Sequence, residues 1–296
     1  MTDLTGERPA DVATRHTLVQ RRPVAVFLLI AFAVGFPSLS VPLFTGLPDE
    51  PFLLVYLYVA LLTPALLVSG WADGGGSARR LLSRVLIWRF GFGRWLVIVF
   101  AMPVLTLGLA TATGSVHTPG DGWLMEIGLY LFSTLIFGAL LANLWEETAW
   151  GGFVQTRLMA DHGLLVGSLL TAPLFAALHI PLYLAGDPTG PELARSLLIL
   201  FAMAPVYRYL IGMHLLDTRG SILAIGIQHA AWNASGNLES VQGDWQVIVA
   251  VLILTVVMAA LRRMWHASSR PLGKDAEMAA AAGWTEPGAK SSGVQR

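Results

Sequence analysis

The stretch LMEIGLYLFSTLIFGALLANLW, residues 124–145, contains one charged side chain, Glu126. A helix of about 20 residues crosses a bilayer, so this run is long enough to span a membrane. Seven more segments of this kind predict an all-α, polytopic transmembrane bundle of about eight helices. The eight predicted spans are 24–45, 52–70, 95–112, 124–145, 164–185, 196–216, 220–236 and 246–261. The runs lack the alternating pattern of a transmembrane β-barrel.

The composition of the whole chain agrees with a membrane protein. Its 296 residues are 55% hydrophobic and 13% charged, whereas a soluble domain carries about 25% charged residues. The net charge of zero argues against nucleic acid as a partner. The chain has no cysteine, which excludes disulfides, thiol nucleophiles and thiolate metal ligands. A bound metal would need His, Asp, Glu or backbone oxygen ligands.

The basic residues fall on one side of the predicted bundle. With both termini in the cytoplasm, 17 of the 19 Lys and Arg residues lie on the cytoplasmic side; the exceptions are Arg195, in an outer loop, and Arg208, within a span. This distribution follows the positive-inside rule and predicts cytoplasmic termini and an even number of spans. The stretch Ala78–Trp95 spaces arginines among apolar residues and predicts an interfacial helix on the inner leaflet.

Three parts of the chain are predicted. Residues 1–23 form a cytoplasmic N-terminal tail, 24–263 a transmembrane domain with its core at about 124–240, and 264–296 a disordered cytoplasmic tail rich in Ala, Gly and Ser. The first apolar run has no small-residue cleavage site after it, which favours a retained helix over a signal peptide. We expect an integral protein of a bacterial plasma membrane.

Ionisable side chains within the spans indicate function, because each costs at least about 2.5–3.5 kcal/mol to insert. They are Glu126, Glu146, Glu147, His179, Arg208, His214 and His229, with the amide of Asn233 beside them. Glu126 and His214 lie near span ends, where contact with the headgroups suffices. The others form three patterns, in Trp145–Phe153 at the inner end of the fourth span, in Phe175–His179, and in His229–Asn233.

Helix geometry brings these patterns together. Adjacent carboxylates on a helix point about 100° apart, so one can face the interior while the other braces a neighbouring helix. Glu146 and His179 each lie about 25 Å along the helix from the turn at Asp161–Gly163, and therefore at one level. His229 adds to a predicted cluster that faces the cytoplasm. Packed histidines, a glutamate pair at a span end and interhelical hydrogen bonds are the structural alternatives.

A carboxylate beside a histidine in a partly desolvated pocket can act as a general base. Glu146 and His179 would deprotonate a water that attacks a peptide carbonyl, while His229 and Asn233 donate to the oxyanion. Alternatively, Glu146, His179 and His229 would bind a divalent metal such as zinc, with an open position for water. The residues leave both chemistries open, and the His-Glu-x-x-His spacing of soluble zinc proteases is absent.

The patterns, in this order on late spans, resemble the CAAX-protease and bacteriocin-processing (Abi) family of intramembrane endopeptidases. The resemblance covers about residues 140–240 and rests on the motifs Glu146–Leu158, His179–Leu182 and Thr218–Leu223, followed by His229. It implies a glutamate-type or metal-assisted hydrolase related to the type II prenyl-protein endopeptidase. In such an enzyme Glu146 would activate water with His179, His229 and Asn233 would stabilise the oxyanion or help hold a metal, and Glu147 would orient the site.

The chain departs from this family at one position. The family usually places an arginine four residues after the second glutamate, where this chain has Gly151. Arg208 is the other cation within a span, and we hypothesise that it pairs with Glu147. Snorkelling of Arg208 to the inner interface, between two tyrosines, is the alternative.

These features predict an endopeptidase that cuts a membrane-associated peptide or protein near the cytoplasmic leaflet, with the lipid bilayer as its other partner. A second hypothesis is that the protein has the same fold but no catalytic activity, and acts as a membrane scaffold or a bacteriocin self-immunity protein. A third is a proton-coupled transporter, which would require inverted repeats that the sequence does not show.

Overall fold

A computed structural model describes residues 17–185 and 188–268, so most of both predicted tails lies outside the described residues. Within these ranges 84% of the residues are helical and none belongs to a strand, which confirms the all-α prediction. The transmembrane domain was predicted to end at residue 263, but the last helix continues to Ser268.

The first half of the described chain contains short helical elements between longer ones. They are α1 (Leu18–Arg21), α2 (Pro23–Thr45), α3 (Glu50–Leu54), η1 (Val55–Leu62), α4 (Thr63–Asp73), α5 (Ser77–Ser83), η2 (Arg84–Leu86) and α6 (Phe92–Ala112). The second half consists of α7 (Trp123–Leu131), η3 (Phe132–Asn143), α8 (Leu144–Ala149), η4 (Trp150–Gln155), α9 (Thr156–Leu184), α10 (Gly190–Asp217), α11 (Ile222–Gly236) and α12 (Trp245–Ser268). The elements η1, η3 and η4 are π-helical, and η2 is a 3₁₀ turn.

Six helical runs in the described residues are long and apolar enough to cross a membrane. The predicted fourth and fifth spans lie in one run, Trp123–Leu184, which breaks at Gly163, where φ is 81° and ψ is 169°. The predicted seventh span is α11, whose 15 residues are fewer than the roughly 20 that a bilayer requires. The count of eight spans therefore stays a prediction.

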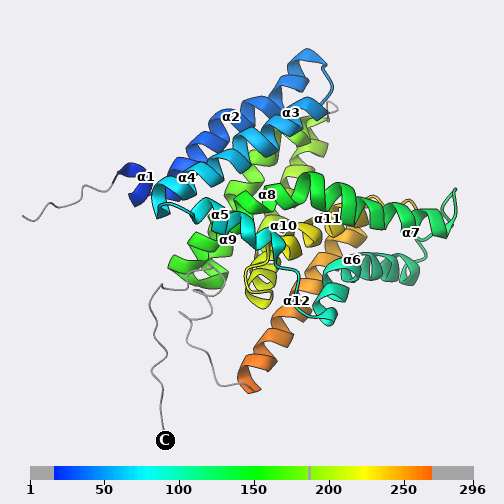
Figure 1. Ribbon diagram of the computed structural model, residues 1–296. Coiled ribbons are helices and arrows are strands. Elements are labelled where there is room, and N and C mark those ends of the chain that lie inside the picture. Colours follow the sequence, from blue (N-terminus) through cyan, green and yellow to red (C-terminus); the bar gives the residue numbers. More distant parts are fainter. Residues whose placement is uncertain (1–16, 186–187, 269–296) are drawn as a thin grey trace, which may run out of the picture.

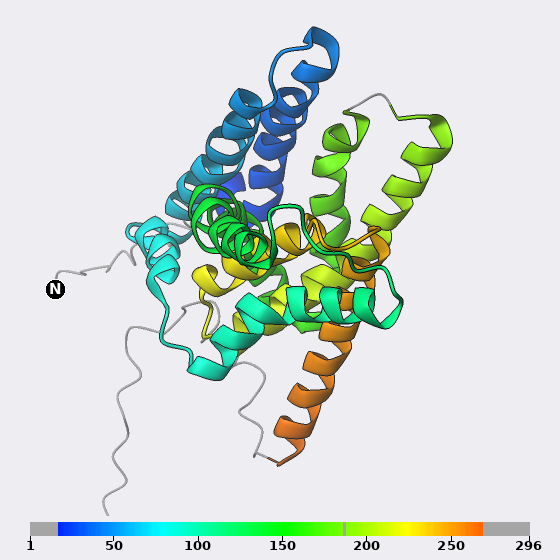
Figure 2. The same cartoon turned by 90° about the vertical axis from the view of Figure 1, so that its right-hand side faces the viewer.

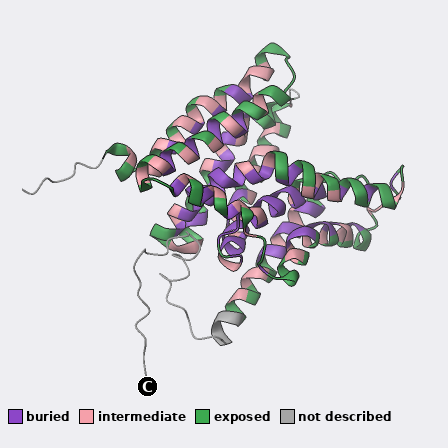
Figure 3. Ribbon diagram, viewed as in Figure 1, coloured by how far each residue is buried: buried purple, intermediate pink, exposed green. Residues whose placement is uncertain are grey.

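The long helices surround a buried centre. α2 lies beside the α3–η1–α4 run, and the second half of α9 lies beside α10, while α7 and η3 project to one side (Figures 1 and 2). Buried residues gather where α8, η4 and α11 cross between these pairs (Figure 3). All six residues of η4 are buried. The glutamate pair on α8 thus lies at the buried centre of the molecule, and its predicted place at the inner end of a span stays a prediction.

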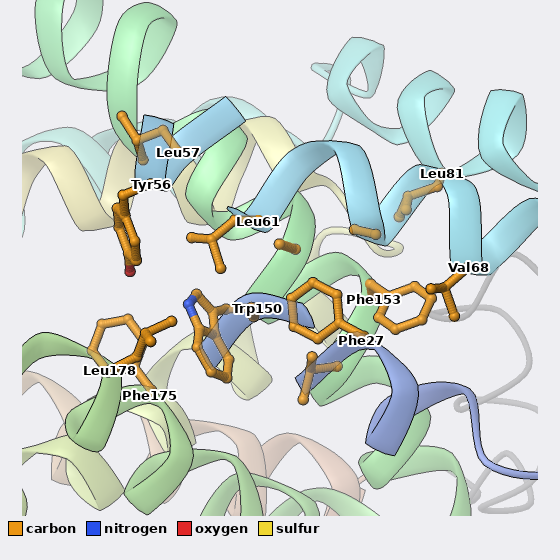
Figure 4. Packing of buried hydrophobic residues seen from close by; sticks show 14 of the residues in the cluster. Phe27, Tyr56, Leu57, Leu61, Val68, Leu81, Trp150, Phe153, Phe175 and Leu178 are labelled. Carbon is orange, nitrogen blue, oxygen red and sulfur yellow. The ribbon is translucent and has the colours of Figure 1, made fainter. Parts of the chain in front are cut away.

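Aromatic side chains fill the core next to this centre. Trp150 is fully buried, with its ring centroid 6.1 Å from that of Phe27 and 5.7 Å from that of Phe175. Phe153 packs on Phe27 at 5.3 Å, and Figure 4 shows these rings between Tyr56 and Val68. Trp150 directly follows α8 in the sequence. The packing of its ring therefore restricts rotation of α8 and with it the direction in which the two glutamates point.

The connection between α4 and α6 differs from the predicted interfacial helix over Ala78–Trp95. Its helical part ends at Leu86, and α6 begins only at Phe92. Arg84 is buried and donates to the carbonyl oxygens of Gly220, at 2.8 Å, and Gly152, at 3.0 Å. Burial lowers the pKa of Arg84 to about 10, so the group stays charged at neutral pH and ties this connection to the centre of the bundle.

Candidate active site

The two glutamates of α8 face different neighbours, as the 100° separation predicted. Glu146 contacts residues of η1 and α9, whereas Glu147 contacts residues of α10 and α11. Glu147 is fully buried and Glu146 is 6% exposed. Glu147 therefore depends on protein groups for its hydrogen bonds, whereas Glu146 also reaches the wall of a cavity.

Glu146 binds its two partners through a single oxygen. Its Oε1 lies 3.1 Å from the hydroxyl of Tyr56, which donates, and 3.1 Å from Nε2 of His179. This contact confirms the prediction that Glu146 and His179 lie at one level. The other oxygen, Oε2, is 3.9 Å from Nδ1 of His229 and accepts no hydrogen bond from the described residues.

The hydrogen bonds of His179 define how its protons are placed. Its Nδ1 lies 2.7 Å from the carbonyl oxygen of Phe175, and because a carbonyl only accepts, Nδ1 carries a hydrogen. A neutral His179 then has a lone pair on Nε2, which faces a carboxylate oxygen. One shared proton satisfies both atoms, either on Glu146 or on His179. The pair is thus arranged to take up or release a proton.

Glu147 is held by a guanidinium from another helix. Arg208 of α10 donates from its two terminal nitrogens to the two carboxylate oxygens, at 2.9 and 2.8 Å, and both side chains are fully buried. The guanidinium carbon also lies 4.0 Å from the centre of the Phe175 ring. The structure confirms the hypothesised ion pair, and a paired fork of this kind is the strong form of a charged hydrogen bond.

Gly151 explains why the cation comes from α10. A Cβ atom built on Gly151 would lie 2.3 Å from Cδ1 of Ile225 and 2.8 Å from Oε2 of Glu147. Ile225 of α11 and the carboxylate of Glu147 occupy the space that a side chain at 151 would need. Arg208 thus supplies the positive charge that the resemblance placed at this position.

His229 of α11 joins the two glutamates. Its Nδ1 lies 2.9 Å from Oε1 of Glu147, and because Arg208 keeps that carboxylate ionised, Nδ1 is the donor. Nε2 of His229 makes no hydrogen bond within the described residues. The Glu147–Arg208 pair thereby fixes the orientation of the ring, as carboxylates do for histidines in many enzyme sites.

A cavity of about 820 Å³ reaches the pair Glu146–His179 and also His229 and Asn233. Its walls are mostly apolar and come from α3, η1, η3, α8, α9, α10, α11 and α12. Asn233 is exposed to this space and also borders a second cavity of about 420 Å³, between α7, η3 and α11. Four of the five predicted site residues thus line one cavity, and Glu147 contacts His229 behind its wall.

The sequence did not identify every residue of the site. Tyr56 bonds Glu146, yet it lies in an apolar run with no motif around it. Tyr207 also lines the cavity, with its ring 5.3 Å from that of His229. Outside the site, Glu126 accepts a hydrogen bond from the backbone N–H of Ser240, and His214 is buried in α10, consistent with their exclusion.

The candidate metal-binding set is Glu146, His179 and His229. Among the described residues, no group of three or more His, Asp or Glu side chains is arranged to hold a metal ion. Glu146 lies next to both histidines, with Oε1 3.1 Å from Nε2 of His179 and Oε2 3.9 Å from Nδ1 of His229, while His229 also hydrogen-bonds Glu147. Metal binding by this set therefore stays a prediction.

The cavity opens at one end of the helices. Its exposed lining residues include Glu50, at the start of α3, and Asp244, just before α12. Both lie at the ends of the helices that the arginine distribution assigns to the outer side. The side of the membrane that the cavity faces, like the orientation of the chain, stays a prediction.

A close approach of two backbones sets the position of His229. A Cβ atom on Gly226 of α11 would lie 2.9 Å from the Cα atom of Leu144 in α8. We expect Gly226→Ala to push α11 away from α8, to destabilise the protein by about 1–3 kcal/mol and to abolish the site's activity. Gly108→Ala is the matched control, because no atom lies within 4 Å of that position. Thermal unfolding in detergent measures both, and equal unfolding temperatures would contradict the close approach.

Comparison with known proteins agrees with the resemblance seen in the motifs. Residues 128–235 match the family model of the type II CAAX prenyl endopeptidase Rce1-like proteins. This segment contains Glu146, Glu147, His179, His229 and Asn233. No curated protein matches the chain.

Proposed function

Because the segment that holds the site matches the type II CAAX prenyl endopeptidase Rce1-like family, we propose that the chain is an intramembrane endopeptidase. The observation that carries the proposal is the hydrogen-bonded pair Glu146–His179 on the wall of a cavity of about 820 Å³. A base and a cavity large enough for a substrate segment are the first requirements of a hydrolase.

The first step is attack by water. A water bound to the free Oε2 of Glu146 transfers a proton to the carboxylate as its oxygen bonds to the carbonyl carbon of the substrate. His179, bonded to Oε1, holds the carboxylate in place and exchanges the shared proton with it. Glu146 then gives the proton to the leaving nitrogen as the carbon–nitrogen bond breaks, which releases a new carboxyl and a new amino terminus.

The tetrahedral intermediate carries negative charge on the former carbonyl oxygen. Asn233 can donate from its amide, and His229 can donate from Nε2 when it is protonated, because Glu147 accepts the hydrogen on Nδ1. Glu147 and Arg208 act as positioning residues, since they orient His229 without lining the cavity. Removing one such oxyanion donor typically costs about 2.7–4 kcal/mol.

The arrangement in the membrane is part of the proposal. We propose eight spans, with α11 as a short crossing in the interior of the bundle and both termini in the cytoplasm. Two features support this proposal: the apolar helices and the concentration of Arg and Lys in alternate loops. Attaching a reporter that is active on one side of the membrane to each loop tests both statements.

Sensitivity to chelators distinguishes the two chemistries that the sequence left open. We expect cleavage by the purified protein to be unchanged after treatment with EDTA or 1,10-phenanthroline. The reason is that Glu146 and His179 form a hydrogen bond with each other and activate water without a metal. The measurement is the cleavage rate of an apolar membrane peptide before and after dialysis. Loss of activity with recovery on adding zinc would instead support the metal-assisted reaction.

A non-catalytic scaffold or self-immunity protein is the second candidate function. In that case Glu146→Gln and His179→Ala would leave the biological effect of the chain intact. Loss of the effect in both variants, with the protein still inserted in the membrane, would support the enzyme.

A further inference from the structure

The arginine-rich connections of the chain all meet at one end of the molecule. Arg157 of α9 pairs with Asp73 at the end of α4, and Arg262 of α12 pairs with Asp217 at the end of α10. The hydroxyl of Ser221, before α11, donates to the carbonyl oxygen of Ile87, at 2.6 Å. Eleven of the 13 described arginines belong to this end, which we call the basic end: Arg21, Arg22, Arg79, Arg80, Arg84, Arg89, Arg94, Arg157, Arg219, Arg262 and Arg263.

The opposite end of the helices is closed by other loops. The backbone N–H of His117 donates to the carbonyl of Ser240, and the N–H of Gln242 donates to the carbonyl of Ser115. These two bonds join the α6–α7 loop to the α11–α12 loop. The N–H of Gly120 in addition donates to the carboxylate of Glu239. Arg195 is the one arginine among the described residues of this end.

The catalytic cavity lies toward this second end. Its lining includes Glu50, Tyr183 and Asp244, which lie at the ends of α3, α9 and α12 that are remote from the arginines. His179 is about 24 Å along α9 from the break at Gly163, but only about 7.5 Å from the last residue of that helix. Arginines of the basic end are absent from its lining.

We propose that the cavity is entered from the non-cytoplasmic side of the membrane, so that the substrate is a membrane-anchored polypeptide cut on that side. The inference rests on the proposed peptidase function and on the positive-inside rule, which assigns the basic end to the cytoplasm. The apolar cavity wall from η1, η3 and α10 accepts an apolar segment of this substrate. A segment confined to the cytoplasm would have to cross the buried layer formed by α8 and η4.

The absence of cysteine from the chain makes the sidedness directly measurable. Asp244→Cys places one thiol at the exposed mouth of the cavity, and Ser83→Cys places one at an exposed position of the basic end. Each variant is treated with a membrane-impermeant maleimide in spheroplasts, before and after permeabilisation. We expect Asp244→Cys to be labelled in intact spheroplasts and Ser83→Cys to be labelled only after permeabilisation.

The reverse labelling pattern, or labelling of both variants only after permeabilisation, would overturn the proposal. A second arm uses two single-span reporters that carry the same apolar segment with its cleavable flank on opposite sides of the membrane. We expect cleavage of the reporter with the non-cytoplasmic flank alone. Cleavage of the cytoplasmic flank alone would overturn the sidedness and leave the peptidase function standing. External labelling of Asp244→Cys without cleavage of any substrate would support the orientation and contradict the function.

Discussion

Replacing Glu146 by Gln should lower kcat for peptide cleavage by about 10²–10⁴-fold, the usual contribution of a general base. Glutamine keeps the size of the side chain and can still accept from Tyr56, so the protein should remain folded and inserted. It cannot take a proton from water, and it cannot share one with His179. The cleavage rate of a membrane peptide by the purified variant in lipid vesicles measures the effect.

Glu192→Gln is a matched control for this substitution. Glu192 lies at the start of α10, where it caps the helix by accepting from Thr189, and it is remote from the cavity lining. We expect wild-type activity from this variant. A Glu146→Gln variant that cleaves as fast as the Glu192→Gln control would contradict the assignment of the base.

Arg208→Ala should have the largest effect on stability. It leaves Glu147 as an unpaired charge at a position with no exposed surface, and breaking a buried pair from one side costs about 3–5 kcal/mol. It also removes the cation that keeps Glu147 ionised. Glu147 then no longer orients His229, so cleavage should be lost. Thermal unfolding in detergent and the cleavage assay measure the two effects.

Two further variants separate charge from packing. The double variant Glu147→Gln with Arg208→Met removes both charges and should unfold closer to wild type than Arg208→Ala does, while still failing to cleave. Adding Gly151→Arg to Arg208→Ala should not restore stability, because a Cβ at 151 meets Ile225 at 2.3 Å. Wild-type stability of Arg208→Ala would show that the pair does not hold the site together.

Much of the site follows from the sequence, because lipid makes ionisable residues conspicuous. Glu146 and His179 lie at equal distances along the helix on either side of the turn at Asp161–Gly163. This spacing predicted that they lie at one level, and the structure shows them 3.1 Å apart. The missing arginine at Gly151 pointed to Arg208, which binds Glu147 through two nitrogens. Both predictions succeeded because each charged group inside a membrane needs a partner, and few candidates were present.

Other features depend on tertiary packing and carry no local signal. Tyr56 bonds Glu146 but is one of several aromatic residues in an apolar run. The central, buried position of α8 has no hydropathy signal, because hydropathy falls at Trp145–Phe153 whether a helix leaves the membrane or enters a polar core. The direction of the cavity depends on how η1, α9 and α12 pack around α8, which helical periodicity does not encode.

The central claim is that Glu146 and His179 hydrolyse a peptide bond with water. Mass spectrometry of apolar membrane peptides, incubated with the protein in vesicles prepared in ¹⁸O-labelled water, tests this claim most directly. The wild type should yield two fragments, with one ¹⁸O atom in the new carboxyl terminus, and Glu146→Gln should yield none. Intact peptides after incubation with the wild type, or the same labelled fragments from Glu146→Gln, would contradict the account.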